Sequence, residues 1–157
     1  AETGLYLIQH RPETQSFYLS AGDSLLMRVN TMAFDESLHF SGKGEAQNNF
    51  LTEMYLLDEA NADLLLSFYK IDPSEFQKKT DSIRERRFET LKKMKEKHKF
   101  SPEFVELARK IITYESNDLK ERYTYLINKY YKEYYNNLPE GFHDYRKKMH
   151  FNEVSLQ

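Results

Sequence analysis

The chain has 157 residues, a formal net charge of −2 and no cysteine. This length fits one domain that can bury a hydrophobic core. The near-neutral charge argues against nucleic acid as a partner, and the lack of cysteine excludes disulfides and thiol chemistry within these residues. No apolar run approaches the roughly 20 residues of a membrane-spanning helix, so we predict no transmembrane segment.

Short apolar runs separated by turn residues fill the first 43 positions, a pattern typical of β-strands. The extended candidates are residues 5–8, 16–20, 24–30 and 38–40, with a loop at 10–14 and a Gly-Asp turn at 21–23. We expect a small antiparallel sheet or meander. Because two or three short strands are marginally stable alone, this sheet must pack on the helices or on a neighbour outside these residues.

The pattern changes from extended to helical between residues 38 and 51, and the rest of the chain is organised around this corner. Gly42 and Gly44 supply the backbone freedom that such a corner needs. The stretch Ser41-Gly42-Lys43-Gly44 invites comparison with a phosphate-binding loop. That motif needs a glycine five residues before Gly-Lys-Ser/Thr, and here Gly44 follows Lys43. We therefore interpret it as a structural strand-to-helix corner.

Two helices are predicted after the corner. The first spans about residues 44–70, with a bend at Asn61 and Asp63, and is apolar on most sides, so it is buried on most sides. The second spans about residues 72–99. There Asp72 can cap the first turn, Pro73 suits the first helical position and Glu75 falls where a capping box places an acid. Its apolar stripe is thin, so we expect an outer helix.

Residues 78–99 of this second helix are markedly basic, and two interpretations remain open. The run could be a patch for a partner, a membrane surface or RNA. It could equally be a solvated outer face with some i, i+4 ion pairs, such as Glu89 with Lys93. We favour the solvated face, because the stacking aromatics expected of single-strand binders are not interleaved there.

The remaining residues also read as helices. Ser101 and Pro102 open a helix by the same capping logic, and Ser-Asn-Asp at 116–118 predicts a break and a new cap. A further helix is predicted over 119–135, an end at 136–141 and a last short helix over 142–151. The predicted fold is therefore α+β and mainly α. It has a β-rich unit at 1–43 and a bundle of four to five helices over 44–151, within a single domain 1–157.

Tyrosines are concentrated on the predicted helix over 119–135. Tyr123, Tyr130 and Tyr134 share one helix face, and Tyr131 and Tyr135 share another. Two tyrosine faces exceed what a single core needs, so one face can contact a partner domain or a ligand. These five tyrosines are the candidate interaction surface, and packing in the core and at its rim is the alternative.

No catalytic or metal-binding constellation is evident. The histidines, at positions 10, 39, 98, 143 and 150, do not fall in pairs at the three- or four-residue spacing of helical metal ligands. Carboxylates are plentiful but scattered, and none stands out as half of an acid–base couple. We therefore expect no metal, no cofactor and no catalytic residue.

Residues 18–51 carry a recognisable pattern. Residues 18–30 read YLSAGDSLLMRVN, residues 34–44 read FDESLHFSGKG and residues 48–51 read NNFL. This region resembles the segment before the thioredoxin-like domain of TlpA/ResA-type thiol-disulfide oxidoreductases of the Gram-negative envelope. The resemblance lies in a β unit with Gly-Asp-Ser and Phe-Ser-Gly-x-Gly, followed by an Asn-Asn-Tyr/Phe-Leu helix entry. It covers about 34 residues, and the later helices match in order alone.

This resemblance implies a periplasmic or envelope-lipoprotein setting and a redox domain beyond residue 157 of the same polypeptide. The Cys-x-x-Cys that performs such chemistry is absent from this chain, so no catalytic residue carries over. The chain would be the accessory, non-catalytic part, which positions the redox domain or binds its protein client. The start at Ala1, without a signal sequence, is typical of a mature or truncated product.

Two further hypotheses remain beside this one. The chain could be a freestanding adaptor that binds a peptide or a sugar, with the aromatic helices forming a groove. An enzyme in its own right ranks third, because nothing in the sequence assembles reactive groups.

Overall fold

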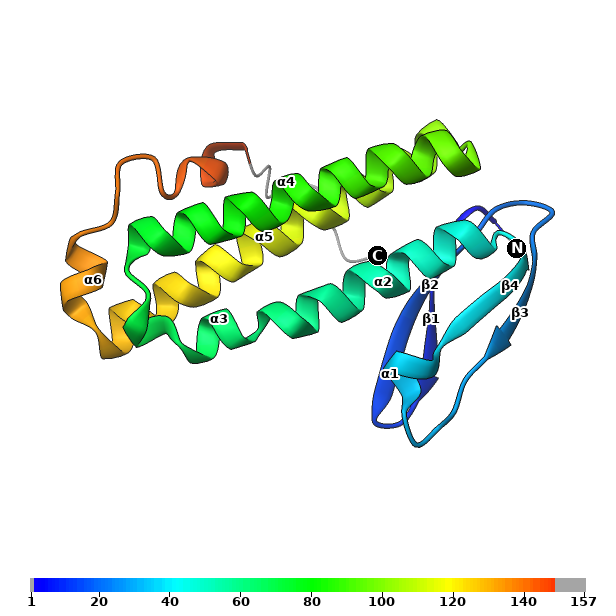
Figure 1. The fold of residues 1–157 in the computed structure, drawn as a ribbon, viewed down its shortest axis with the longest axis horizontal. Helices are drawn as coiled ribbons and strands as arrows, with labels where there is room; N and C mark the ends of the chain where they lie inside the picture. The colour runs from blue at the N-terminus through cyan, green and yellow to red at the C-terminus, as the bar shows by residue number, and fades with distance from the viewer. Residues whose placement is uncertain (1, 149–157) are drawn as a thin grey trace. The chain divides into compact units, whose positions relative to one another are not determined.

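The computed structural model describes residues 2–148, apart from the side chains of residues 59 and 60. The chain is α+β and mainly helical, as the sequence predicts, with the strands near the start and the longer helices after them (Figure 1). A short helix that the sequence analysis did not predict, α1, lies between β3 and β4. None of the helices in this part of the chain is long and apolar enough to cross a membrane. The elements in chain order are β1 (Gly4–His10), β2 (Glu13–Leu19), β3 (Ser24–Arg28), α1 (Phe34–Ser37), β4 (His39–Lys43), α2 (Glu45–Asn61), α3 (Asp63–Leu66), η1 (Phe68–Lys70), α4 (Pro73–His98), α5 (Pro102–Tyr130), α6 (Lys132–Asn136) and η2 (Asp144–Lys148).

The strands form two separate antiparallel hairpins instead of one meander. β1 pairs with β2, and β3 pairs with β4. The loop predicted at 10–14 is shorter, because β1 continues to His10 and β2 begins at Glu13. The predicted turn at 21–23 is present. Asp23 closes it by accepting a hydrogen bond from the Ser20 N–H at 2.8 Å, yet the strands that it joins do not pair with each other.

The chain divides into two compact units, which we describe separately. Unit 1 comprises the residues up to Ala62 together with Arg87–Lys110, and unit 2 comprises Asp63–Arg86 and the residues from Ile111 onward. Unit 1 therefore contains both hairpins and α2, and unit 2 contains α3, α6 and η2.

Aromatic side chains form the core of unit 1. Phe104 lies at its centre, with ring centroids 4.8 Å from Phe100, 5.0 Å from Tyr18 and 6.3 Å from Phe50. All four rings are buried. Because such ring pairs stabilise beyond the area that they bury, β2, α2 and α5 are held together here by residues from distant parts of the sequence. A second cluster under the hairpins comprises Phe34, Leu38 and Phe40, with Ile8, Phe17, Leu25 and Val29 packed against it.

One buried ion pair also belongs to unit 1. Arg87 of α4 is almost completely buried and pairs with Asp58 of α2. Charged groups are rarely buried unless they are paired. Arg87 is one of the basic residues in the run 78–99. It is therefore paired inside unit 1 and is not part of a basic surface.

The start of α4 agrees with the sequence, whereas the single helix predicted over about 44–70 is divided into α2, α3 and η1. α2 ends at Asn61 and α3 begins at Asp63, where the bend was predicted. The Asp72 carboxylate accepts hydrogen bonds from the N–H groups of Ser74 at 2.9 Å and Glu75 at 3.0 Å. This geometry satisfies two of the unpaired N–H groups of the first turn, so the predicted cap is confirmed.

The predicted break at 116–118 is wrong, because α5 is one continuous helix. Ser116 and Asn117 are buried on its inner side, and Asp118 pairs with Arg122 at 2.8 Å one turn later. The buried positions keep the same helical spacing on both sides of these residues, so packing outweighs their preference for capping. The break occurs instead at Tyr131, before α6. Of the last predicted helix, residues 144–148 form η2, and residues 149–151 lie outside the described part.

Candidate functional site

Two adjacent asparagines near the start of α2, Asn48 and Asn49, hydrogen-bond both hairpins of unit 1. The Asn48 side chain accepts a hydrogen bond from the Tyr18 N–H at 2.6 Å and donates one to the Tyr18 carbonyl at 2.7 Å. Asn49 does the same with Phe40, at 2.8 Å in each direction. A side-chain amide carries both a donor and an acceptor, so each asparagine pairs with a strand as a neighbouring backbone would. We call this pair the asparagine clamp.

The glycine corner before α2 has a structural role. Gly42 has a φ of +99°, and a Cβ at this position would overlap the backbone oxygen of Ser24. Its N–H donates to the Glu45 carboxylate at 2.9 Å. An anion would have to compete with this carboxylate at the start of α2, so the geometry favours the strand-to-helix corner over a phosphate loop.

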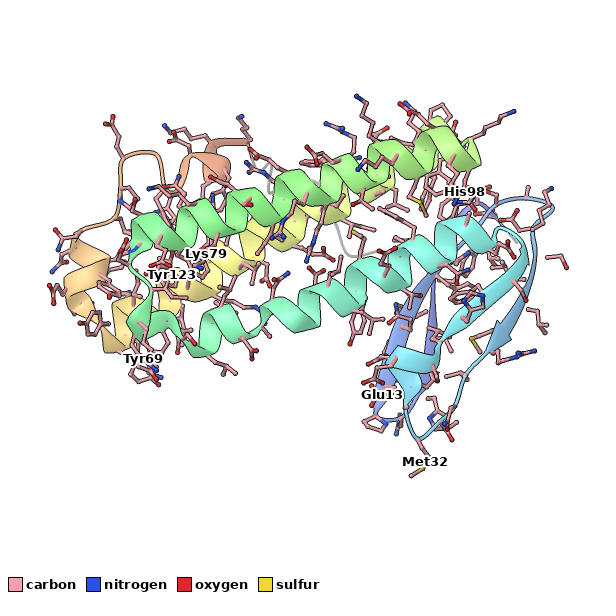
Figure 2. The ribbon with its side chains drawn as sticks, in the orientation of Figure 1. Glu13, Met32, Tyr69, Lys79, His98 and Tyr123 are labelled. Atoms are coloured by element: carbon pink, nitrogen blue, oxygen red, sulfur yellow. The ribbon has the colours of Figure 1, made fainter. Side chains whose placement is uncertain are left out.

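Tyr123, one of the five candidate tyrosines, belongs to the core of unit 2. It is completely buried, and its hydroxyl donates a hydrogen bond to the Ile71 carbonyl at 2.6 Å. Its ring stacks on Phe76 with centroids 3.9 Å apart, and Figure 2 shows it between α4 and α5. Burial raises the pKa of this hydroxyl well above its usual value. Tyr123 is therefore not available to a partner.

The other four candidates lie at the junction of α5 and α6. Tyr130, Tyr131 and Tyr135 are exposed, and Tyr134 is half-buried. Tyr131 and Tyr134 contact each other edge to face, with ring centroids 4.3 Å apart. Desolvation raises the pKa of Tyr134, and the neighbouring Tyr131 adds to this shift. The structure thus separates the single tyrosine group of the sequence into one core residue and an outer group.

Lysine side chains cover several of the exposed rings. The Lys129 ammonium lies 5.1 Å from the centroid of Tyr130 and 5.6 Å from that of Tyr125, and Lys132 lies 5.1 Å from Tyr135. Such cation–π contacts each stabilise by roughly 0.5–1 kcal/mol at exposed sites. The Lys129 ammonium donates hydrogen bonds to the hydroxyl oxygens of Tyr130 and Tyr125, and these bonds raise the pKa of Lys129.

Tyr69 of η1 is an exposed ring that the sequence reasoning missed. Lys70 lies 5.3 Å from its centroid, and its neighbour Phe68 packs 6.2 Å from Tyr130. Figure 2 shows Tyr69 on the outer side of unit 2. The sequence could not reveal that Tyr69 lies near the tyrosines of α5, because the two segments are far apart in the chain and share no periodic pattern. We call the whole set the tyrosine–lysine surface: Tyr69, Lys70, Tyr125, Lys129, Tyr130, Tyr131, Lys132 and Tyr135.

A segment after α6 is anchored to α5 by polar contacts, and one of them pairs a hydroxyl with an imidazole. Thr124 Oγ1 lies 2.9 Å from His143 Nε2 and donates a hydrogen bond to the Lys120 carbonyl at 2.7 Å. The Lys120 carbonyl and His143 Nε2 thus both lie within hydrogen-bond distance of the Thr124 hydroxyl, which has one proton to donate, and the imidazole tautomer decides the direction of the Thr124–His143 bond.

Glu121 provides the strongest anchor of this segment. It accepts a hydrogen bond from the Tyr145 hydroxyl at 2.6 Å and a bidentate pair from Arg146 at 2.6 and 2.7 Å. The Arg146 hydrogen bond lowers the pKa of Glu121, and burial raises that of Tyr145. Burial and the nearby Arg146 together lower the pKa of His143. These shifts are explained by packing and pairing, and they require no reactive role.

The surroundings of Lys120 complete this network. Lys120 is nearly buried, and its ammonium lies 3.0 Å from Asp81 and 5.9 Å from the ring centroids of both Phe142 and Tyr145. A buried lysine needs such an anionic partner to stay charged. The ion pair joins α5 to α4, and the contacts of Lys120 with the two rings help to fix the segment from Phe142 to Arg146, which we call the C-terminal strap, against α5.

Within residues 2–148, no group of three or more His, Asp or Glu side chains is placed to hold a metal ion. Comparisons with protein-family models, with curated proteins and with solved structures found no match to this chain.

Proposed function

We propose that this chain is a non-catalytic interaction domain, and that it forms the N-terminal accessory part of a thioredoxin-like thiol-disulfide interchange protein of the TlpA/ResA type. In this proposal it lies in the periplasm or on an envelope lipoprotein. Its partners are the redox domain of the same polypeptide and a protein client of that domain.

The observation that carries the interaction role is the tyrosine–lysine surface. Tyrosine is enriched at protein interfaces because its ring gives a large contact area and its hydroxyl remains hydrogen-bonded. Here exposed rings from η1, α5 and α6 are accompanied by ammonium groups at 5.1 to 5.6 Å. Such a surface suits a protein partner that offers apolar side chains together with carboxylates.

The resemblance over residues 18–51 supports the identity of the parent protein. Its Asn-Asn pair is the asparagine clamp, and its Phe-Ser-Gly-x-Gly run contains Phe40 and Gly42 at the contacts just described. These residues are required for the architecture of unit 1. The resemblance is therefore concentrated at positions where substitution would be structurally costly, and this is compatible with a shared scaffold.

The first test is the coding sequence that follows Gln157. The proposal expects a thioredoxin-like domain with a Cys-x-x-Cys motif, and a different kind of domain there would refute the proposed parent. The second test is calorimetric titration of that domain, and of reduced and oxidised client proteins, into this chain.

Tyr130 and Tyr114 provide a matched pair of variants for the titration. Each is 61% exposed on α5, but only Tyr130 belongs to the tyrosine–lysine surface. Tyr130→Ala should weaken binding about tenfold, the effect of losing an interface hot spot, while Tyr114→Ala should leave it unchanged. Equal effects would exclude this surface as the binding site. Binding of peptides or sugars without any redox partner would instead favour the freestanding adaptor.

A further inference from the structure

The two inner strand edges of unit 1 are occupied. The asparagine clamp takes the N–H and C=O of Tyr18 on β2 and of Phe40 on β4. Unpaired strand edges template pairing with other chains, so natural proteins usually cover or guard them. This clamp covers the edges of β2 and β4 at these two positions, and it leaves β1 and β3 as the outer strands of the two hairpins.

The clamp also shows which backbone groups of β1 face outward. Tyr18 lies opposite Leu5 in the hairpin, and both of its backbone groups are directed to Asn48. In an antiparallel ladder the two residues of such a non-hydrogen-bonded pair direct their N–H and C=O groups to opposite outer edges. Leu5 therefore presents its groups to the free edge of β1. Leu7 and Gln9 do so as well, because the pattern repeats every second residue.

Within the described residues 2–148, no paired strand, bulge, proline or charged side chain guards this edge over residues 4–9. β1 is seven residues long and pairs without a bulge from Gly4 to His10. Its residues 4–9 include no charge and no proline, and within residues 2–148 its only sheet neighbour is β2 (Figure 1). The side chains of Leu5 and Leu7 are 44% and 72% exposed. β3 is shorter and ends in Arg28.

We propose that β1 is a homodimer interface, in which β1 of one copy pairs antiparallel with β1 of a second copy about a twofold axis at Leu7. This register places Leu7 opposite Leu7 and Leu5 opposite Gln9. Leu5, Leu7 and Gln9 of each strand then lie opposite residues whose N–H and C=O groups also point to the shared edge. Each of these three pairs exchanges two backbone hydrogen bonds, which gives about six in total. A second copy fits because a strand without charge places no like charges opposite each other.

Cysteine cross-linking tests both the pairing and its register, since the natural chain has no cysteine to interfere. Hydrogen-bonded antiparallel partners have Cα atoms about 5.5 Å apart, within the range of a disulfide. Leu7→Cys should therefore form an intermolecular disulfide under mild oxidation. Leu26→Cys on β3 is the control, because Leu26 is comparably exposed at 64% but lies on the other hairpin.

Sedimentation equilibrium of the unmodified chain should give twice the 18.8 kDa of one copy, with a concentration-dependent monomer fraction. Leu7→Lys places two ammonium groups at the axis and should raise the dissociation constant several-fold, whereas Leu26→Lys should leave it unchanged. A chain that stays monomeric at millimolar concentration would overturn the proposal. Equal cross-linking of the two cysteine variants, or equal weakening by the two lysine variants, would also overturn it.

Discussion

Replacing Asn48 with alanine is expected to destabilise unit 1 strongly, because the change breaks the asparagine clamp at its buried half. Asn48 is 1% exposed, and the variant loses its bonds to both backbone groups of Tyr18 and to the Gly44 carbonyl at 2.9 Å. The Tyr18 N–H and C=O are then left buried without partners, at about 1–3 kcal/mol each. We expect a total loss of about 3–4 kcal/mol in the free energy of unfolding.

The neighbouring Asn49 is the internal control for this reasoning. It makes the same two bonds, to Phe40, but at a partly buried position where water can replace them. Asn49→Ala should therefore cost about 1–2 kcal/mol. Asn48→Asp keeps the acceptor and removes the donated bonds while burying a charge, so it should be no more stable at pH 7 than the alanine variant.

Urea unfolding followed by circular dichroism measures these differences as shifts in the midpoint at constant slope. A loss below about 1 kcal/mol for Asn48→Ala would refute the view that its amide replaces a neighbouring strand. Equal losses for the two alanine variants would refute the argument from burial. Hydrogen exchange at the Tyr18 amide offers a direct readout, since this proton should lose protection only in the Asn48 variants.

Three further changes test other parts of the structure. Tyr123→Phe removes the hydrogen bond to Ile71 and should lower the free energy of unfolding by about 1–2 kcal/mol in urea titrations. Gly42→Ala combines a φ of +99° with a backbone overlap and should cost at least about 2 kcal/mol in thermal melts, while Gly4→Ala, which meets nothing within 4 Å, should be neutral. The folded-state pKa of His143 lies below its unfolded value, so the unfolded chain binds more protons as the pH falls through the window between them. The contribution of neutral His143 should be complete above about pH 6.5 and be lost below it, and this part of the pH dependence should be absent from the unfolding curves of His143→Gln.

Local signals made much of the fold predictable. The short apolar runs of the first 43 positions, the glycine corner and the Asp72 cap each depend on residues close in sequence, and the structure contains strands, corner and cap. The break predicted at Ser116 failed because burial of α5 outweighs the preference of its residues. The break at Tyr131 has no local signal, since helix-forming residues continue across it.

The candidate site was predictable only in part. Periodicity alone placed Tyr123 and Tyr130 on one face, yet the first is buried against Phe76 and the second is exposed. Only the position of the neighbouring elements distinguishes them. The same reason hid Tyr69, which joins the surface from a distant segment. The two asparagines were visible as a motif, but their partners lie 30 and 9 residues away, so their role could not be read from the sequence.

The consecutive positions of Asn48 and Asn49 have a mechanical consequence. Side chains of adjacent helix residues point about 100° apart. Asn48 and Asn49 can therefore hydrogen-bond two different hairpins, which do not pair with each other, from neighbouring positions on α2. A rotation of α2 about its axis would strain the hydrogen bonds of both asparagines at the same time. A force applied to either hairpin would therefore be transmitted to the other through α2, and the two hairpins should resist that force together.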